Sequence, residues 1–369
     1  MIVAYLGLIC VILSLGLSGG VYVRTVTGGA GFGSSDGDVS IATFDLPGAL
    51  IVAADDSIVY VADTGNHKIR RIHVAEDSNT GGVLTAVGTV DTLAGTGEMG
   101  DTDSQKEGTW SSKESPTDPS ELSCPAQFNH PAGLSLAKDA EDNYRILFVA
   151  DRDNHAIRLV DLWTGWVSTT INSDSKVDGL SMYTPVGVAA DLDNNLYIAD
   201  TGNNRIIKAV LTQVDRPVDV AQDYLGNSAR VRIWVKEASA RLWSFVPVGG
   251  VASPMSLAVT LRGDSLFVAD TYNHRILDVN TADKSVKVLA GDGTVGSSDG
   301  DGVLASFSYP YGVAMSSDHS VLYVTDRNNH MIRSVGAANG ETQSIAGLGG
   351  YGGLDGDASS SQVSLVLHR

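Results

Sequence analysis

One polar turn recurs five times along the 369-residue chain and repeats the same reactive residue types at the same spacing. Each copy reads Asp, two variable residues, Asn, and then His or Asn. The copies begin at Asp63, Asp151, Asp200, Asp270 and Asp326. Carboxylate and imidazole groups together could ligate a metal ion or exchange protons. Repetition in every copy instead favours a structural role, because Asp and Asn side chains bond their own turn backbone.

The His of this turn is replaceable within the chain itself, because Asn204 stands in its place in the third copy. We therefore predict structural roles for Asp63, Asn66, His67, Asp151, Asn154, His155, Asp270, Asn273, His274, Asp326, Asn329 and His330. Arginines 70, 158 and 333 are expected to pair with neighbouring turn carboxylates or carbonyls.

Positions that differ between otherwise equivalent copies are better candidates for function. The two residues after the turn Asp are Thr-Gly in the first and third copies, and Arg152-Asp153, Thr271-Tyr272 and Arg327-Asn328 in the others. Among the residues that precede five regularly placed prolines, His130 and Tyr309 stand out against Leu, Thr and Ser. Arg and Tyr side chains most often anchor interfaces. We predict a binding site composed of Arg152, Asp153, Tyr272, Arg327, His130 and Tyr309.

Two glycine-containing sequence motifs resemble motifs that bind cofactors or metal ions. The pattern G-x-G-x-x-G at 291–296 recurs at 95–100 and 347–352, but no helix is predicted after any copy to face a pyrophosphate. The Asp-Gly-Asp motifs at 36–38, 299–301 and 355–357 offer hard oxygen donors. These could hold calcium, although a solvated turn is the simpler interpretation, so we expect no cofactor with calcium as the exception.

The elements around the turns are short strands. Each Asp turn joins two alternating apolar segments, as a β-hairpin does. Prolines 47, 131, 185, 254 and 310 each open an apolar run before the hairpin, and segments such as 90–95, 286–291 and 342–347 follow it as an outer strand. Four antiparallel strands repeated at about 50 residues predict an all-β fold, a β-propeller.

The repeated pattern YVADTGNHKIRRI, with its strand proline and its glycine-rich loop, resembles the NHL repeat over residues 24–350. The resemblance implies a propeller of the six-bladed type, of which five blades are recognisable and the sixth is incomplete. Residues 23–28 match an outer strand and are expected to close the ring by pairing with strands from the C-terminal end. Residues 361–369 are predicted to be a tail or a truncated blade, with the other three strands of the sixth blade missing. Truncation is favoured over a blade improvised from the two ends.

Three further segments complete the predicted organisation. Residues 1–20 are predicted to be a signal peptide or membrane anchor, because 1–23 carry no charge, and a buried strand is the alternative. Residues 21–360 form the propeller, with an acidic loop insertion at 98–124. Residues 211–230 are expected to add a turn of helix before the outer strand of the third blade. The predicted location is secreted or membrane-anchored, outside the cytoplasm, with a membrane tether through residues 1–23.

The net charge of −18 argues against nucleic-acid binding, which needs Lys and Arg along the phosphate backbone. No HExxH motif is present. We predict a monomeric, non-enzymatic scaffold that binds a protein or a small extracellular ligand through its loop-rich face. The alternative implied by the resemblance is a metal-dependent enzyme of the amidating-lyase or lactonase type, with His130 and the turn residues as the nearest ligands.

Overall fold

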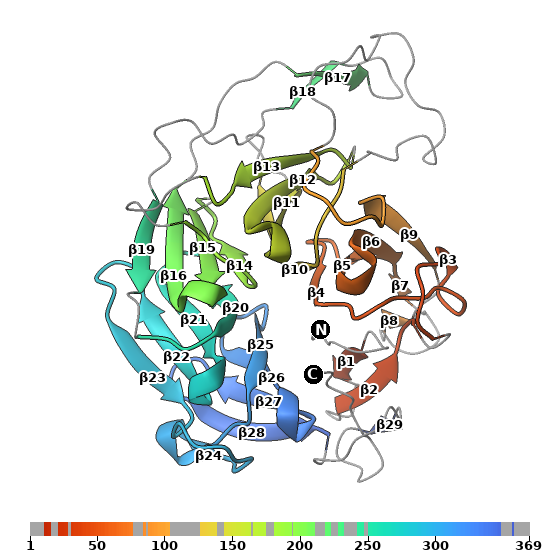
Figure 1. Cartoon of the computed structure of the whole chain (residues 1–369). Helices are drawn as coiled ribbons and strands as arrows, with labels where there is room; N and C mark the ends of the chain where they lie inside the picture. Colours follow the sequence, from red (N-terminus) through yellow and green to blue (C-terminus); the bar gives the residue numbers. More distant parts are fainter. Residues whose placement is uncertain are drawn as a thin grey trace.

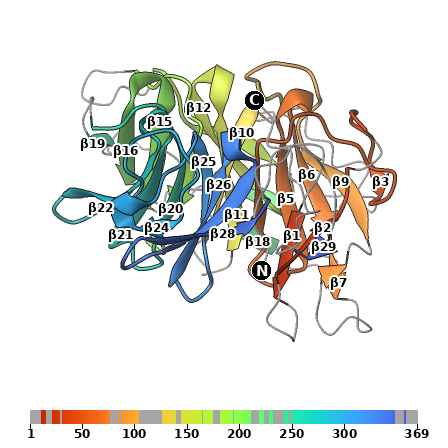
Figure 2. The same ribbon diagram turned by 90° about the horizontal axis from the view of Figure 1, so that it is seen from below.

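The computed structural model describes residues 11–15, 21–28, 31–76, 84–85, 88–103, 126–138, 144–163, 165–174, 181–193, 195–210, 218–222, 228–231, 242–246, 250–347 and 356–357. Within these ranges the chain forms β-strands and short 3-10 turns, and no α-helix. Figure 1 shows the strands grouped into blades around a central axis, and Figure 2 shows the resulting disc from the side. The predicted all-β propeller is confirmed.

Five four-stranded antiparallel blades form the ring, each running outward from an inner strand. Blade one has β4 (Ala49–Val52), β5 (Ile58–Asp63), β6 (Lys68–His73) and β9 (Thr89–Ala94). Blade two has β10 (Pro131–Lys138), β11 (Tyr144–Asp151), β12 (Ala156–Asp161) and β13 (Val167–Ile171). Blade three has β14 (Val188–Ala190), β15 (Asn195–Asp200), β16 (Arg205–Val210) and β19 (Leu242–Val246). Blade four has β20 (Pro254–Val259), β21 (Ser265–Asp270), β22 (Arg275–Asn280) and β23 (Val286–Ala290). Blade five has β25 (Pro310–Met315), β26 (Val321–Asp326), β27 (Met331–Gly336) and β28 (Glu341–Ala346).

The hydrophobic core lies between the blades. One cluster joins Phe148 of blade two to Leu196 and Ile207 of blade three, and equivalent clusters fill the junctions between blades one and two, three and four, and four and five. Because both faces of a blade pack against neighbours, the second strand of most blades buries nearly every residue, as in β21. This packing holds the inner strands in fixed positions around the axis.

Each hairpin turn is one 3-10 turn between a buried Asp and a residue with a left-handed backbone. These turns are η1 (Thr64–Asn66), η3 (Arg152–Asn154), η4 (Thr201–Asn203), η5 (Thr271–Asn273) and η7 (Arg327–Asn329). The residue after each turn, His or Asn204, has a left-handed backbone with φ between 50° and 55°. A further 3-10 turn, η6 (Gly302–Leu304), lies before blade five.

A sixth sheet joins the two ends of the chain. Strands β1 (Val11–Leu15), β2 (Val21–Thr25) and β29 (Gly356–Asp357) pair in this order, and Figure 1 places β1 and β2 beside blade one. The glycine of β29 pairs with Val23, five residues before Gly28. The same spacing occurs in blades one and five. In blade one, Gly37 of β3 (Gly37–Asp38) pairs with Val90, five residues before Gly95. In blade five, Gly300 of β24 (Gly300–Asp301) pairs with Thr342, five residues before Gly347.

This shared register identifies β2 as the outer strand of a sixth blade, so the predicted closure by residues 23–28 is confirmed. The prediction that the other three strands of that blade are missing is wrong for one of them. Strand β1 lies beside β2, in the place that β6 takes beside β9. The apolar pattern of residues 11–15 suits a strand as well as a signal peptide, so sequence alone did not separate the two.

Two hairpins extend from the ring. They are β7 (Ala75–Glu76) with β8 (Leu84–Thr85), and β17 (Val218–Gln222) with β18 (Ser228–Val231). The helical turn expected at 211–230 is wrong for the described part, which forms the second hairpin, drawn above the ring in Figure 1. Most of the acidic insertion 98–124 and all of 361–369 lie outside the described residues. No helix in the described ranges is long and apolar enough to span a membrane.

Candidate functional site

The turn aspartates form buried networks that hold each blade. The Asp63 carboxylate is fully buried and accepts hydrogen bonds from the Arg70 guanidinium at 2.7 Å and from the Asn66 amide at 2.8 Å. Asp151 and Asp326 have the same partners in blades two and five, with Arg158 and Arg333 as predicted. Arg205 and Arg275 take this place in blades three and four. The turn Asn also donates to a glycine-rich loop, as Asn66 does to the Gly33 carbonyl at 2.7 Å, so loops and turns share one face.

The turn histidines connect neighbouring blades. Nδ1 of His67 accepts the backbone N–H of His130 at 3.1 Å, across the junction between blades one and two. His155 and His274 do the same for the N–H groups of Thr184 and Tyr309. Asn204 replaces the imidazole with its Oδ1, which accepts the N–H of Ser253 at 2.7 Å. These contacts support the predicted structural role of the turn histidines.

The first residue after the turn Asp forms a second link between blades. Hydroxyl groups of Thr64, Thr201 and Thr271 donate to the carbonyls of the prolines that open the next inner strand, at 2.6, 2.6 and 2.7 Å. The accepting prolines are Pro131, Pro254 and Pro310. In blades two and five this position holds Arg152 and Arg327. Arg152 therefore gives up a stabilising link that blades one, three and four keep, whereas no proline-led inner strand follows blade five in the described residues.

These positions surround one end of the central axis, which we call the axial mouth. It consists of the residues after each turn Asp and the residues before and after each strand proline. The six predicted site residues all lie here, because the prolines pair with the turn aspartates, as Pro131 does with Asp151 and Pro310 with Asp326. The binding role of these six residues stays a prediction.

One group at the axial mouth is charged. Nε of Arg152 donates to Asp153 at 2.8 Å, and Nδ1 of His130 lies 2.8 Å from the same carboxylate. About a third of each side chain is exposed. Burial opposes ionisation of Asp153, but the hydrogen bond and charge of Arg152, together with His130, hold the pKa of Asp153 below its usual range. Asp153 is therefore ionised at neutral pH.

The other group is aromatic. The Tyr272 side chain is 61% exposed, and its ring meets the ring of Tyr309 edge to face at 5.6 Å. Tyr309 in turn packs against His274 at 4.6 Å. The Arg327 guanidinium lies over the ring of Tyr311, 5.0 Å from its centre. Aromatic rings beside guanidinium groups are suited to hold a ligand that is partly apolar and partly charged.

Tyr311 is a residue that the sequence comparison missed. It directly follows a strand proline, where the other inner strands have Gly48, Ala132, Val186 and Met255. The same comparison between copies that selected Arg152 would have selected Tyr311, had it been extended one residue past the proline. Tyr311 matters because it lines the central channel as well as the axial mouth.

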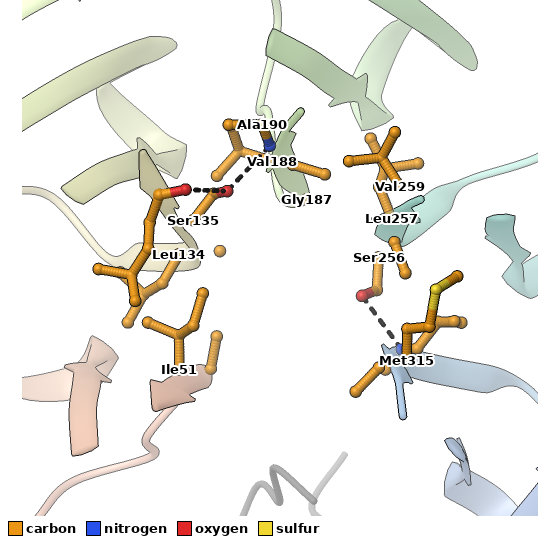
Figure 3. Close-up of a pocket in the computed structure, with 18 of the residues that line it drawn as sticks. Ile51, Leu134, Ser135, Gly187, Val188, Ala190, Ser256, Leu257, Val259 and Met315 are labelled. Carbon is orange, nitrogen blue, oxygen red and sulfur yellow. Dashed lines mark hydrogen bonds between the residues drawn. The ribbon is translucent and has the colours of Figure 1, made fainter. Parts of the chain in front are cut away.

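The channel below the axial mouth has a volume of about 420 Å³ and is lined by the five inner strands. Figure 3 shows Ile51, Leu134, Val188, Leu257 and Met315 around it. The serine hydroxyls on its wall are used between blades, since Ser135 accepts the N–H of Ala190 at 2.9 Å and Ser256 that of Val313 at 3.1 Å. The wall is therefore mainly apolar.

The Asp-Gly-Asp motifs have structural partners. Asp36 accepts hydrogen bonds from the buried Arg70, and Asp299 from the buried Arg333 at 2.7 Å. Asp38 accepts from the backbone and hydroxyl of Ser40. Across the part of the chain that the structure describes, no group of three His, Cys, Asp or Glu side chains is placed to hold a metal ion.

A model of the NHL repeat matches residues 182–208, which include the inner strand, the Asp turn and the third strand of blade three. The other four blades repeat the strands and turn of this segment. The chain contains an NHL repeat and folds as a β-propeller.

Curated relatives of this NHL-repeat propeller are longer proteins. The chain is 27% identical to the chloroplastic protein SUPPRESSOR OF QUENCHING 1 of Arabidopsis thaliana, over 86% of this chain and 27% of that protein. It is 26% identical to NHL repeat-containing protein 2 of Bos taurus, over 85% of this chain and 42% of the relative. The chain thus spans between about a quarter and two fifths of these relatives. A structural-genomics protein of unknown function from Bacteroides thetaiotaomicron shares the fold, with a TM-score of 0.59 and 15% identity over 94% of this chain and 69% of that one.

The NHL repeat itself accounts for the buried Asp and Arg networks and for the His links, since these recur from blade to blade. The six predicted site residues, which differ between repeats, lie at the axial mouth. Arg152, Asp153 and His130 are in contact, as are Tyr272 and Tyr309, while Arg327 contacts Tyr311.

Proposed function

We propose that this NHL-repeat propeller is a non-enzymatic binding scaffold whose binding surface is the axial mouth. One observation carries the proposal. Arg152 replaces a threonine that links neighbouring blades in three of the five copies. A residue that gives up a repeated stabilising contact is most simply explained by a role outside the fold, since stability is commonly lost where function is gained.

The side chains at the axial mouth support binding more than catalysis. Exposed Tyr272 and the partly exposed Arg152 are residue types that dominate binding energy in interfaces. The turn histidines use Nδ1 to hold the next blade, which leaves them fixed in position. The proposed partner is a protein or a small ligand.

A location outside the cytoplasm is also proposed, and it rests on the uncharged segment 1–23 alone. Sequencing the N-terminus of the protein purified from its source tests this location.

The test replaces the distinctive residues with those of the generic copies. The triple variant Arg152→Thr, Tyr272→Gly, Arg327→Thr gives blade four the Thr-Gly pair of blades one and three, and gives blades two and five their Thr. We expect the triple variant to lose the molecules that the wild-type protein retains from an extract of its source, while it unfolds at a temperature no lower than that of the wild type. Lys287→Ala, on an outer strand, is the matched control and should retain them. Equal retention by the triple variant and the wild type would remove the axial mouth as the binding surface.

A further inference from the structure

The central channel has a second opening, on the face opposite the axial mouth. The inner strands run from the axial mouth to that face, as β10 does from Pro131 to Lys138. Channel residues that lie where the inner strands end therefore surround the second opening. Three of them are large and apolar and come from blades two, three and four: Tyr144, Leu192 and Leu261. We call these three residues the apolar collar.

The collar residues are exposed although they are apolar. Tyr144, Leu192 and Leu261 keep 40%, 42% and 48% of their surface accessible. The backbone N–H of Leu192 donates to the carbonyl of Leu261 at 3.4 Å, which joins blades three and four at this opening. Tyr144 pairs with Lys138, whose ammonium lies 5.3 Å from the centre of the tyrosine ring. Exposed apolar side chains grouped at the entrance of a cavity are typical of a binding site.

The channel wall behind the collar offers no unpaired charge to a ligand. Of the described residues that line it, only Lys138 and Asp191 are charged, and their charges have opposite sign. The buried Asp191 carboxylate accepts the N–H groups of Asp193 and Asn195 at 3.0 and 2.9 Å, and the Asn195 amide at 2.8 Å. The serine hydroxyls of the wall already serve contacts between blades. A charged ligand would therefore lose its hydration without a compensating partner.

The size and the surface of the channel suit a small apolar molecule. Its volume of about 420 Å³ lies within the range of ordinary small-molecule sites. Aliphatic side chains such as Ile51, Val188, Val259 and Met315 form the wall, as Figure 3 shows. An apolar molecule that leaves water for this wall gains free energy in proportion to the area buried.

We propose that the apolar collar and the channel behind it form a binding site for an uncharged, apolar small molecule, which enters from the face opposite the axial mouth. This site is separate from the axial mouth and goes beyond the proposed function. Binding covers the exposed collar side chains and the ligand at the same time, and it leaves no charged group without water or a partner.

Fluorescence titration of the full chain with two related dyes tests the inference. N-phenyl-1-naphthylamine is uncharged, and 8-anilino-1-naphthalenesulfonate carries a sulfonate on the same aromatic body. We expect saturable binding of the uncharged dye, at least about tenfold tighter than that of the sulfonate, and displacement of the uncharged dye by decanol. No saturable binding of the uncharged dye, or equal or tighter binding of the sulfonate, would overturn the inference.

Variants of the collar locate the site. Leu192→Asp and Leu261→Asp each place a charge at the second opening, and the fold should tolerate them because both positions are exposed. Each should weaken binding of the uncharged dye by about threefold, and the double variant by about tenfold or more. Val286→Asp is the matched control, at a position 43% exposed on the outer strand of blade four, and should bind as the wild type does. Unchanged binding by the double variant would overturn the inference.

The triple variant of the axial mouth separates this inference from the proposed function. It should bind the uncharged dye as the wild type does, because none of its three altered positions lines the channel. Loss of the dye from the triple variant would place the ligand at the axial mouth and overturn the inference. If the wild type fails to bind the dye while the triple variant loses its retained partner, the inference falls and the proposed function stands.

Discussion

The backbone N–H of His130 donates to Nδ1 of His67, 3.1 Å away in the neighbouring blade. This bond joins a predicted site residue to a residue of the repeated framework. His130 has a left-handed backbone with φ of 54°, an unfavourable conformation for a residue with a Cβ, and the bond helps to hold it there. The framework thus fixes the position from which the His130 side chain reaches Asp153.

Replacement of His67 should depend on whether an acceptor is kept. His67→Ala leaves the N–H of His130 without its partner and should lower the free energy of unfolding by about 1–3 kcal/mol. His67→Asn should cost less, because Asn204 already performs this role for Ser253 in blade three. Urea denaturation of both variants measures the difference, and equal losses would show that the bond to Nδ1 contributes nothing.

The same bonds predict how stability depends on pH. Burial, with the charge that His130 carries when protonated, holds the pKa of His67 below its usual 6.5, and burial does the same to His274. The unfolded chain therefore takes up a proton first. Stability from these groups is complete above about pH 6.5 and is lost as the pH falls through that value toward the native pKa.

Unfolding free energies at pH 7.5 and 5.5 check this expectation. The double variant His67→Asn, His274→Asn keeps neutral acceptors that do not titrate, so its loss of stability on acidification should be smaller than that of the wild type. The same loss in both proteins would assign the pH dependence to other groups.

The hydrogen bond from the turn threonine to the next strand proline predicts that replacing Arg152 with threonine stabilises the fold. Arg152→Thr should restore a bond to the Pro185 carbonyl like the one from Thr201 to Pro254, and should raise the free energy of unfolding by about 0.5–1.5 kcal/mol. Thr201→Val removes such a bond and should lower the free energy of unfolding. Thermal and urea denaturation measure both changes. A destabilised Arg152→Thr variant would mean that the arginine itself supports the fold.

Two adjacent arginines should differ strongly in their effect on stability. Arg70 is fully buried with Asp63, so Arg70→Met leaves a buried carboxylate without its cation and should cost about 3–5 kcal/mol. Arg71 pairs with Asp91 at the surface, and Arg71→Met should cost no more than about 1 kcal/mol. Chemical denaturation compares the two variants. Similar losses would contradict the view that the turn networks hold the blades.

Glycines that follow the strand prolines test how closely the blades approach. A Cβ on Gly133 would lie 2.2 Å from the carbonyl oxygen of Val186, just before the next inner strand β14, so Gly133→Ala should cost about 1–3 kcal/mol. At the equivalent Gly312 a Cβ would meet the Thr325 hydroxyl at 3.0 Å, and a side chain can move more easily than a backbone. Gly312→Ala should therefore be milder, and the reverse order in thermal unfolding would contradict the packing of β10 against β14.

The repeated part of the fold could be predicted from sequence because its causes are local. The turn Asp, the strand proline and the alternating strands recur at fixed spacing, so five blades are visible without a structure. The buried pairs of Arg70, Arg158 and Arg333 were also predictable, since each lies seven residues after its Asp.

Contacts between distant residues were not predictable in this way. The Thr64 hydroxyl donates a hydrogen bond to the carbonyl of Pro131, which is 67 residues away, and neither segment carries a sequence signal that predicts this contact. The Asp-Gly-Asp motifs suggested calcium because their acids are adjacent in sequence, whereas Asp36 meets Arg70 from 34 residues away. Tyr311 was missed because only its place beside Arg327 and the channel gives it meaning.

The pairing of β2 with β29 has a consequence for synthesis of the chain. Residues 21–25 are made before the five blades, but residues 356–357, which pair with them, are made after all five blades. Throughout translation that edge offers unpaired backbone groups to any other nascent strand. The pairing of β2 with β29 therefore cannot form until all five blades have been made.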